Sequence, residues 1–136
     1  LFPEIDRTLS ILSGHGMSLT IDGAAQVLLT MESDPLRFAA DVPVDATLVD
    51  GAITDLNVMT RRGRFAHCVE RRASSFSVHG CERGETVYLL ATGPVTFTTA
   101  GETVELEALD CVLIGEDASV TAENIVCYEI RLQGAA

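Results

Sequence analysis

Arg7 is the first residue in this chain whose type and position could do chemistry. Residues 5–11 alternate between apolar and polar side chains, and Arg7 falls in phase with the apolar ones. If those apolar residues face the core, Arg7 does too, and a buried guanidinium is costly unless an anion pairs with it. The anion would be a carboxylate of the protein or of a bound ligand. The alternatives are a structural ion pair, or the opposite strand phase with Arg7 in solvent.

Residues 55–61 belong to an expected strand whose two faces differ in chemistry. One face carries an acid, an amide, a thioether and a guanidinium, a set that suits the wall of a polar cavity. A guanidinium grips a carboxylate with a fork of N–H groups. The alternative is a polar face in plain contact with solvent, against which the methionine argues. The residues of this face are Asp55, Asn57, Met59 and Arg61.

These two segments predict one binding site for a small carboxylate. In a β-barrel, inward-facing residues of different strands converge on a single cavity. We expect Arg7, Asn57 and Arg61 to grip the carboxylate there, with Met59 against the ligand's carbon skeleton and Asp55 completing the ligand-binding set. Replacing either arginine with Met should weaken binding by about 2–4 kcal/mol and leave the fold intact.

A basic cluster surrounds the second segment and holds five of the nine basic residues. It could bind an anion or the acidic face of a partner. For Arg62, Arg71 and Arg72 we prefer the ordinary outcome, which is a solvated side chain or a pair with the protein's own acids. The cluster consists of Arg61, Arg62, Arg64, Arg71 and Arg72.

No metal or cofactor is expected. A divalent metal needs three or four converging nitrogen and oxygen ligands, for example an HxH pair, a Glu and a further His. The three histidines of this chain, His15, His67 and His79, are isolated singletons. There is also no GxSxG motif and no Gly-rich phosphate loop. We therefore expect a metal-free protein, which elemental analysis would check.

The composition limits the partners and the cellular compartment that are expected for this chain. The chain has 136 residues, a net charge of −11 and 47% hydrophobic residues, enough for a real core and too acidic for a nucleic-acid partner. No apolar run has the length of a membrane span and no charged leader is visible, so we expect a cytoplasmic protein without membrane contact. Four free thiols are expected, although a disulfide between Cys68 and Cys81 is an alternative. Cys111 and Cys127 lie in apolar runs, where a thiol packs as a small hydrophobe.

The elements that position these residues are short strands. Period-two alternation broken by Gly, Asp and Pro dominates the chain, and no segment has a helical period over three turns. Many short strands at this spacing predict an all-β sandwich, jelly roll or barrel. The expected strands cover residues 5–11, 17–21, 27–29, 36–38, 44–49, 53–60, 65–69, 74–78, 86–91, 95–98, 103–106, 111–114, 119–121 and 125–132.

Two sequence stretches resemble a known family. "FPEIDRTLSILSGHGMSL", followed by "DLNVMTRRG", is similar to the HutD/Ves family of cupin-like proteins, and the resemblance runs from Phe2 to the C-terminal strands. The family's "DR" falls on Asp6 and Arg7, and its second motif falls on residues 55–61. Family members begin further upstream, with a segment ahead of the "FP" motif. We therefore expect the natural protein to contain residues before Leu1.

The resemblance implies a fold and a role. The fold would be a cupin-type jelly roll of the bicupin kind, a single compact unit of two small fused barrels with expected halves 1–78 and 79–136. HutD proteins are encoded with bacterial histidine-degradation enzymes, and no established catalytic activity comes with the family. The resemblance thus implies a metal-independent binder of a small carboxylate metabolite, similar to formylglutamate or urocanate, with a regulatory or moderating role in histidine utilisation.

Two other functions stay open at this stage. The chain could be an isomerase or hydrolase that uses Asp55 or Glu4 as a general base beside an arginine. It could also be a protein–protein interaction module. A homodimer is expected, because sheet edges must be paired or covered and two-fold assemblies are common.

Overall fold

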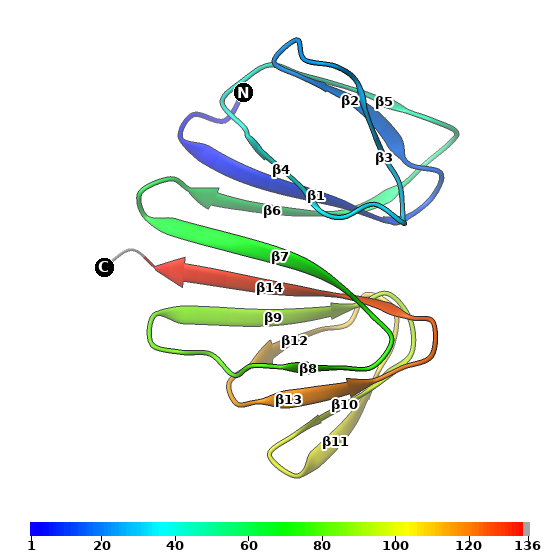
Figure 1. The fold of residues 1–136 in the computed structure, drawn as a ribbon, viewed down its shortest axis with the longest axis vertical. Helices are drawn as coiled ribbons and strands as arrows, with labels where there is room; N and C mark the ends of the chain where they lie inside the picture. Colours follow the sequence, from blue (N-terminus) through cyan, green and yellow to red (C-terminus); the bar gives the residue numbers. More distant parts are fainter. Residues whose placement is uncertain (135–136) are drawn as a thin grey trace. The chain divides into compact units, whose positions relative to one another are not determined.

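Fourteen β-strands make up all the regular secondary structure in residues 1–134, the part of the chain that the structure, a computed structural model, describes (Figure 1). Each of the expected strands is present. The chain divides into two compact units, Leu1–Ala66 and His67–Ala136. Within the described residues, no helix is long and apolar enough to cross a membrane.

The first unit is built from two three-stranded antiparallel sheets. Their strand orders are β4-β1-β6 and β3-β2-β5. A buried cluster from both sheets fills the space between them, formed by Leu9, Ile11, Met17, Leu19, Leu29 and Phe38. The strands are β1 (Ile5–Ser13), β2 (Met17–Ile21), β3 (Val27–Leu29), β4 (Leu36–Ala39), β5 (Val44–Leu48) and β6 (Thr54–Arg61).

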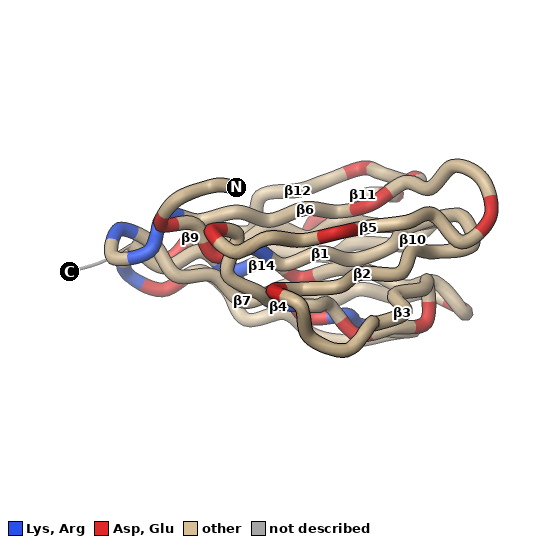
Figure 2. The backbone as a smooth tube through the Cα atoms, turned by 90° about the horizontal axis from the view of Figure 1, so that it is seen from above, with Lys and Arg blue, Asp and Glu red and all other residues tan. Residues whose placement is uncertain are grey.

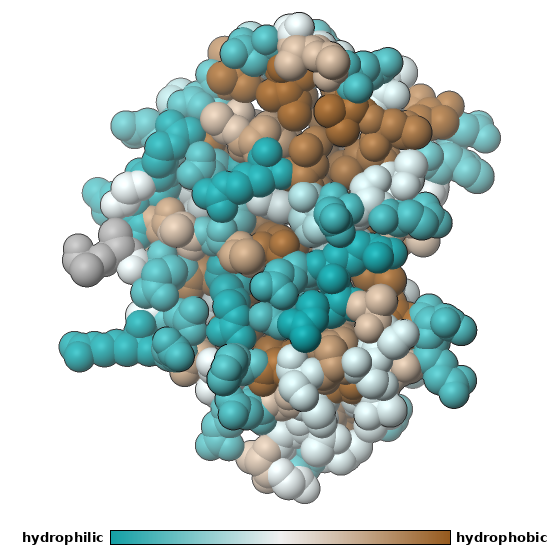
Figure 3. Space-filling model, viewed as in Figure 1, coloured by the Kyte–Doolittle hydropathy of each residue, from teal (hydrophilic) through white to brown (hydrophobic). Residues whose placement is uncertain are grey.

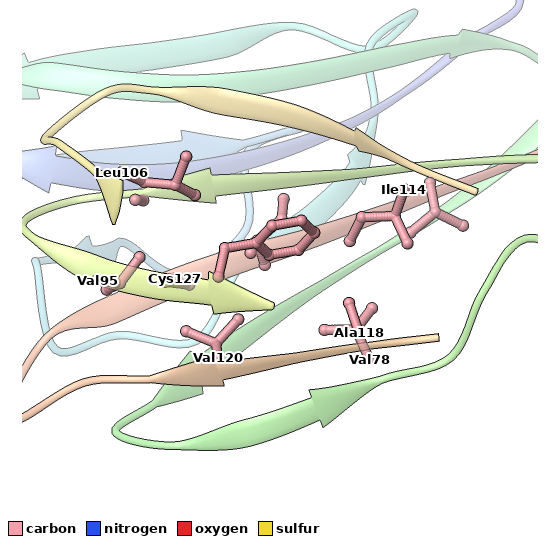
Figure 4. Packing of buried hydrophobic residues seen from close by; sticks show 11 residues of the cluster. Val78, Val95, Leu106, Ile114, Ala118, Val120 and Cys127 are labelled. Atoms are coloured by element: carbon pink, nitrogen blue, oxygen red, sulfur yellow. The ribbon is translucent and has the colours of Figure 1, made fainter. Parts of the chain in front are cut away.

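The second unit repeats this plan with two four-stranded sheets. Their orders are β11-β10-β13-β8 and β12-β9-β14-β7. Figure 4 shows the aliphatic side chains of both sheets gathered between them, with Cys127 among them. Phe97 belongs to the same buried cluster. The strands are β7 (Phe65–Ala73), β8 (Phe76–Val78), β9 (Glu85–Ala91), β10 (Val95–Thr99), β11 (Glu102–Leu106), β12 (Cys111–Ile114), β13 (Ala118–Thr121) and β14 (Val126–Gly134).

Tight turns join neighbouring strands where the sequence predicts them. The hairpin between β10 and β11 turns at Ala100 and Gly101, which have φ values of 50° and 78°. Positive φ at both central residues is the geometry of a type I′ turn, whose twist matches that of the flanking strands. The Asp22-Gly23 turn has the same signs, with φ values of 49° and 72°.

The boundary between the units differs from the expected halves. The units divide between Ala66 and His67, earlier in the chain than the boundary expected at residues 78 and 79. The reason is strand pairing: β7 lies beside β14, and β8 pairs with β13. From His67 onward, both strands therefore belong to the second unit. Pairs so distant in sequence leave no local pattern from which a boundary could be predicted.

The cysteines all lie in the second unit, and all four are free thiols. Cys127 is buried among the core residues, as its apolar surroundings predict. Cys111, which the sequence predicts to pack in the same way, is exposed. The reason is strand phase: Cys111 shares the outward face of β12 with the exposed Leu113, whereas Ile114 on the other face is buried.

Apolar side chains also reach the surface of the first unit. Figure 3 shows them gathered over β2 and β3 on the visible face. Leu28, on β3, is 58% exposed, and Leu48, at the end of β5, is 48% exposed. Figure 2 shows acidic residues distributed along the whole chain, with basic residues at fewer positions.

Candidate functional site

The pairing of β1 with β6 places the predicted binding residues on one face of the β4-β1-β6 sheet. Directly opposed residues of an antiparallel pair point to the same side, and alternate positions repeat that side. Arg7 lies opposite Met59, and Asn57 lies opposite Leu9. The strand phase with Arg7 on the face of Leu9 is thus the one that the structure adopts. The remaining pairs of this face are Ile5 with Arg61 and Ile11 with Asp55.

Arg7 and Asn57 are joined by a direct hydrogen bond. The Nε–H of Arg7 donates to Oδ1 of Asn57 over 2.8 Å. The guanidinium also lies over the ring of Phe38, 5.4 Å from its centroid, a cation–π distance. Asn57 in turn directs its Nδ2 to the sulfur of Met59 at 3.7 Å. These contacts fix the orientation of the guanidinium and leave its two terminal nitrogens, Nη1 and Nη2, without a protein partner among residues 1–134.

This face is more open than the closed cavity that the sequence predicts. Arg7 is half-buried, Met59 is 37% exposed, and Asn57 and Arg61 are exposed. The polar half of the face lies where the buried cluster of the unit ends, beyond Leu9. The structure therefore provides a shelf with one oriented guanidinium and not an enclosed pocket.

The five predicted residues do not all converge. A strand rises about 3.3 Å per residue, so Asp55 and Arg61, six positions apart on β6, are roughly 20 Å from each other. Asp55 lies beside the apolar core, opposite Ile11, and is exposed. The group that the structure brings together is Arg7, Asn57 and Met59. Arg61 follows as the next residue of the same face.

A separate ion-pair network anchors the start of β1. Arg62 contacts Asp6 at 3.0 Å and Asp41 at 3.2 Å. This is the pairing with the protein's own acids that the sequence predicts for Arg62. The Arg62 guanidinium holds the pKa of Asp41 below its usual range, and the two carboxylates raise the pKa of Arg62. The backbone N–H of Arg62 also donates to the carbonyl of Glu4 over 2.7 Å, which ties the N-terminal turn to the end of β6.

The second unit contains a polar cluster that the sequence analysis did not single out. Glu129 is 4% exposed, and its two carboxylate oxygens accept from Arg72 and Arg131, each at 2.9 Å. Arg131 also contacts Glu85 at 3.3 Å. Arg72 lies over the ring of Phe76, 4.7 Å from its centroid. The carboxylates and guanidiniums alternate, so each guanidinium is neutralised inside the protein.

This cluster lines a hollow of about 420 Å³ in the second unit. A second hollow of about 480 Å³ shares Ser77 and His79 with the first and includes Asp117, 3.6 Å from His79. None of the five predicted binding residues lines either hollow. In residues 1–134, no group of three or more His, Cys, Asp or Glu side chains is placed to hold a metal ion.

Strand phase does not reveal Glu129 and Arg131. On β14 they fall in phase with the buried Cys127, but the other apolar residues of the strand, Tyr128 and Ile130 among them, occupy the opposite phase. The reasoning that selects Arg7 on β1 therefore predicts a solvent-facing position for both. The sequence alone could not show that Arg72, far away on β7, completes the cluster.

A comparison with known families decides the identity of the chain. A family model described as HutD matches residues 1–127. The chain belongs to the HutD family. Protein Ves of Cronobacter sakazakii is 37% identical over 90 residues, which cover 65% of this chain and 49% of that protein. The chain therefore spans about half the length of the curated relatives that it matches.

Solved structures show the fold of this HutD family member. A conserved protein of unknown function from Pseudomonas aeruginosa is 26% identical, with a TM-score of 0.83 over 98% of this chain and 74% of that one. HutD from Pseudomonas fluorescens, in a formate condition, is 26% identical, with a TM-score of 0.81 over 99% and 71%. A cupin 2 conserved barrel domain protein from Leptotrichia buccalis has a TM-score of 0.52 at 9% identity over 96% and 74%, a likeness of fold alone. The all-β cupin-type fold that the sequence predicts is thus confirmed.

Proposed function

We propose that the first unit of this HutD family member binds a small carboxylate metabolite through Arg7 and has a regulatory or moderating role in histidine utilisation. The observation that carries the proposal is the partner of Arg7. Arg7 as a residue is half-buried, yet the side chain that orients its guanidinium is the neutral amide of Asn57. A ligand carboxylate would supply the missing negative charge.

The geometry suits that chemistry. Asn57 occupies the Nε–H of Arg7 and leaves Nη1 and Nη2 as a pair of parallel donors, the arrangement that binds a carboxylate with two hydrogen bonds. Phe38 and Met59 flank the guanidinium with apolar surface. Such bonds to a charged acceptor are roughly twice as strong as neutral ones. A ligand with one carboxylate and a short carbon skeleton would satisfy both parts of the shelf.

One relative was studied in the presence of a carboxylate. HutD from Pseudomonas fluorescens was determined in a formate condition, and formate is the smallest carboxylate. Formylglutamate and urocanate, the ligands that the family resemblance suggests, both carry carboxylates. The role in histidine utilisation rests on the HutD family alone and concerns the whole protein, of which this chain covers a part.

Thermal unfolding with a panel of carboxylates tests the proposal. A ligand that binds only the native state stabilises it by about 2.7 kcal/mol at a concentration of 100 times its Kd. Formate, urocanate and formylglutamate should raise the Tm, and their amides should not. Arg7→Met should abolish the shift, while Arg64→Met, an exposed arginine in the turn after β6, serves as the matched control. A panel without any Tm shift, or shifts that survive Arg7→Met, would contradict carboxylate binding at this shelf.

A turnover assay separates a binder from an enzyme. Any metabolite that raises the Tm is incubated with the protein and followed by mass spectrometry. We expect the metabolite to be recovered unchanged. Its conversion would favour the alternative in which a carboxylate near Arg7 acts as a general base.

A further inference from the structure

We infer that this shelf prefers dicarboxylates to monocarboxylates, with Arg7 holding one carboxylate and Arg61 the other. The inference rests on the proposed carboxylate site and names its class of ligand. The observation behind it is that two guanidiniums without acidic partners lie next to each other on one face of the sheet.

Register defines the spacing between the two arginines. Arg7 lies opposite Met59, and Arg61 is two positions further along β6, on the same face. Such diagonal neighbours have Cα atoms about 7–8 Å apart. A short dicarboxylate can bridge that separation, because both side chains are long and Arg61 is exposed and able to adjust. Longer chains would have to fold back on themselves.

Several arginines of this protein have the acidic partners that Arg7 and Arg61 lack. The chain has no lysine, so all nine basic residues are arginines, against twenty acids. Four of the arginines form ion pairs within the described part of the chain, namely Arg37, Arg62, Arg72 and Arg131. Neither Arg7 nor Arg61 forms one among those residues, although the protein offers an excess of carboxylates. Two like charges at this separation repel each other, and a bound dianion would relieve that repulsion.

The residues around the pair define how the ligand lies. Met59 stands between Asn57 and Arg61 in the row of side chains along β6 and offers apolar surface to methylene groups. Asp55 lies at the far end of this row, where its negative charge would repel a second carboxylate. A dianion bound at Arg7 therefore extends toward Arg61 and away from Asp55.

A pair of matched ligands tests the inference. Glutarate carries two carboxylates, and glutaramate replaces one of them with a neutral amide of nearly the same shape. Titration calorimetry at low salt should show glutarate binding about fivefold more tightly, the range expected when an exposed ion pair is added. The preference should shrink at about 1 M salt, where the Debye length is about 3 Å. Succinate and adipate in the same titrations would define the preferred chain length.

Variants of Arg61 complete the test. Arg61→Gln should remove the preference, so that glutarate and glutaramate bind with equal affinity, whereas Arg61→Lys should retain most of the preference. Equal affinities of the two ligands for the unaltered protein, or a preference that survives Arg61→Gln, would overturn the inference and leave the carboxylate site standing. Failure of both ligands and of every monocarboxylate to bind would overturn the proposed function itself.

Discussion

Two arginine clusters, one in each unit of this protein, differ in how the guanidinium charge is balanced. In the second unit, Arg72 and Arg131 converge on the buried carboxylate of Glu129. In the first unit, Arg7 is oriented by the neutral amide of Asn57 and has no acidic partner among the described residues. A protein can therefore stabilise a guanidinium within a barrel by supplying an internal anion, or it can orient the group and leave its charge for a ligand. The first arrangement supports the fold, and the second can support binding.

The largest expected effect on stability comes from removing the negative charge of Glu129, the buried carboxylate of the second unit. Glu129→Gln keeps the shape of the side chain but leaves two guanidiniums without a negative partner, and breaking such a buried pair is strongly destabilising. Because the side chains of Arg72 and Arg131 are 29% and 21% exposed, water can replace part of the loss. We expect a loss of about 2–3 kcal/mol in urea unfolding. Asp55→Asn in the first unit is the control and should change stability by less than about 0.5 kcal/mol.

Thiol labelling reports on the second unit, since all four cysteines lie there. Burial raises the pKa of Cys127 to about 11. At pH 8 its thiolate population, and hence its rate of alkylation, should be roughly a hundredfold below that of an ordinary thiol. Mass spectrometry of the native protein should show Cys127 modified last, and Glu129→Gln should accelerate its modification. Titration of the denatured, unreduced protein should find four thiols, and a missing pair would reveal a disulfide.

The contact between Arg7 and Asn57 should contribute less to the free energy of unfolding than the contacts of Glu129 do. It joins a charged donor to a neutral acceptor at a partly exposed position, so we expect a coupling of about 1 kcal/mol. A double-mutant cycle with Arg7→Met and Asn57→Ala, measured by urea unfolding, gives this value. A coupling as large as the effect of Glu129→Gln would show that Arg7 is a structural residue of the same kind as Arg72 and Arg131.

The smallest expected difference is in acid stability, where the two units should behave alike. The pKa of Asp41 is lowered by its hydrogen bond with Arg62, and that of Asp117 by the backbone N–H of Gly80. Carboxyls with lowered folded-state pKa values stabilise the fold above about pH 4 and lose that contribution as the pH falls further. The urea concentration at the unfolding midpoint should therefore decrease as the pH is lowered beneath about 4. Asp41→Asn should make this decrease slightly less steep. If the urea midpoint of Asp41→Asn depended on pH as steeply as that of the unaltered protein, the pair of Asp41 with Arg62 would be broken in solution.

Much of the fold could be predicted from the sequence, because short strands with one buried face leave a period-two pattern. The alternation that predicts β1 also predicts the face of Arg7, and the hydrogen bond to Asn57 is consistent with it. What the sequence could not provide was the neighbour of each strand. The position of the unit boundary depends on which strands pair across the chain.

The candidate site was predictable in its residues and not in its shape. Strand phase and the family resemblance select Arg7 and Asn57, and register brings them together. The same phase argument groups Asp55 with Arg61, although distance along the strand separates them. Periodicity tells which face a side chain occupies, whereas convergence depends on the twist and order of the sheets. For the same reason, the cluster around Glu129 required the structure.

The most direct test of the contrast between the two units is an NMR titration of protein labelled with ¹⁵N-arginine, following the Nε–H signals during addition of formate or glutarate. Assignments come from Arg7→Met, Arg61→Met, Arg72→Met and Arg131→Met. The Arg7 signal should shift saturably, that of Arg61 should follow with glutarate, and those of Arg72 and Arg131 should stay in place. A saturable shift of Arg72 and Arg131 with an unmoved Arg7 signal would contradict the account and move the site to the second unit.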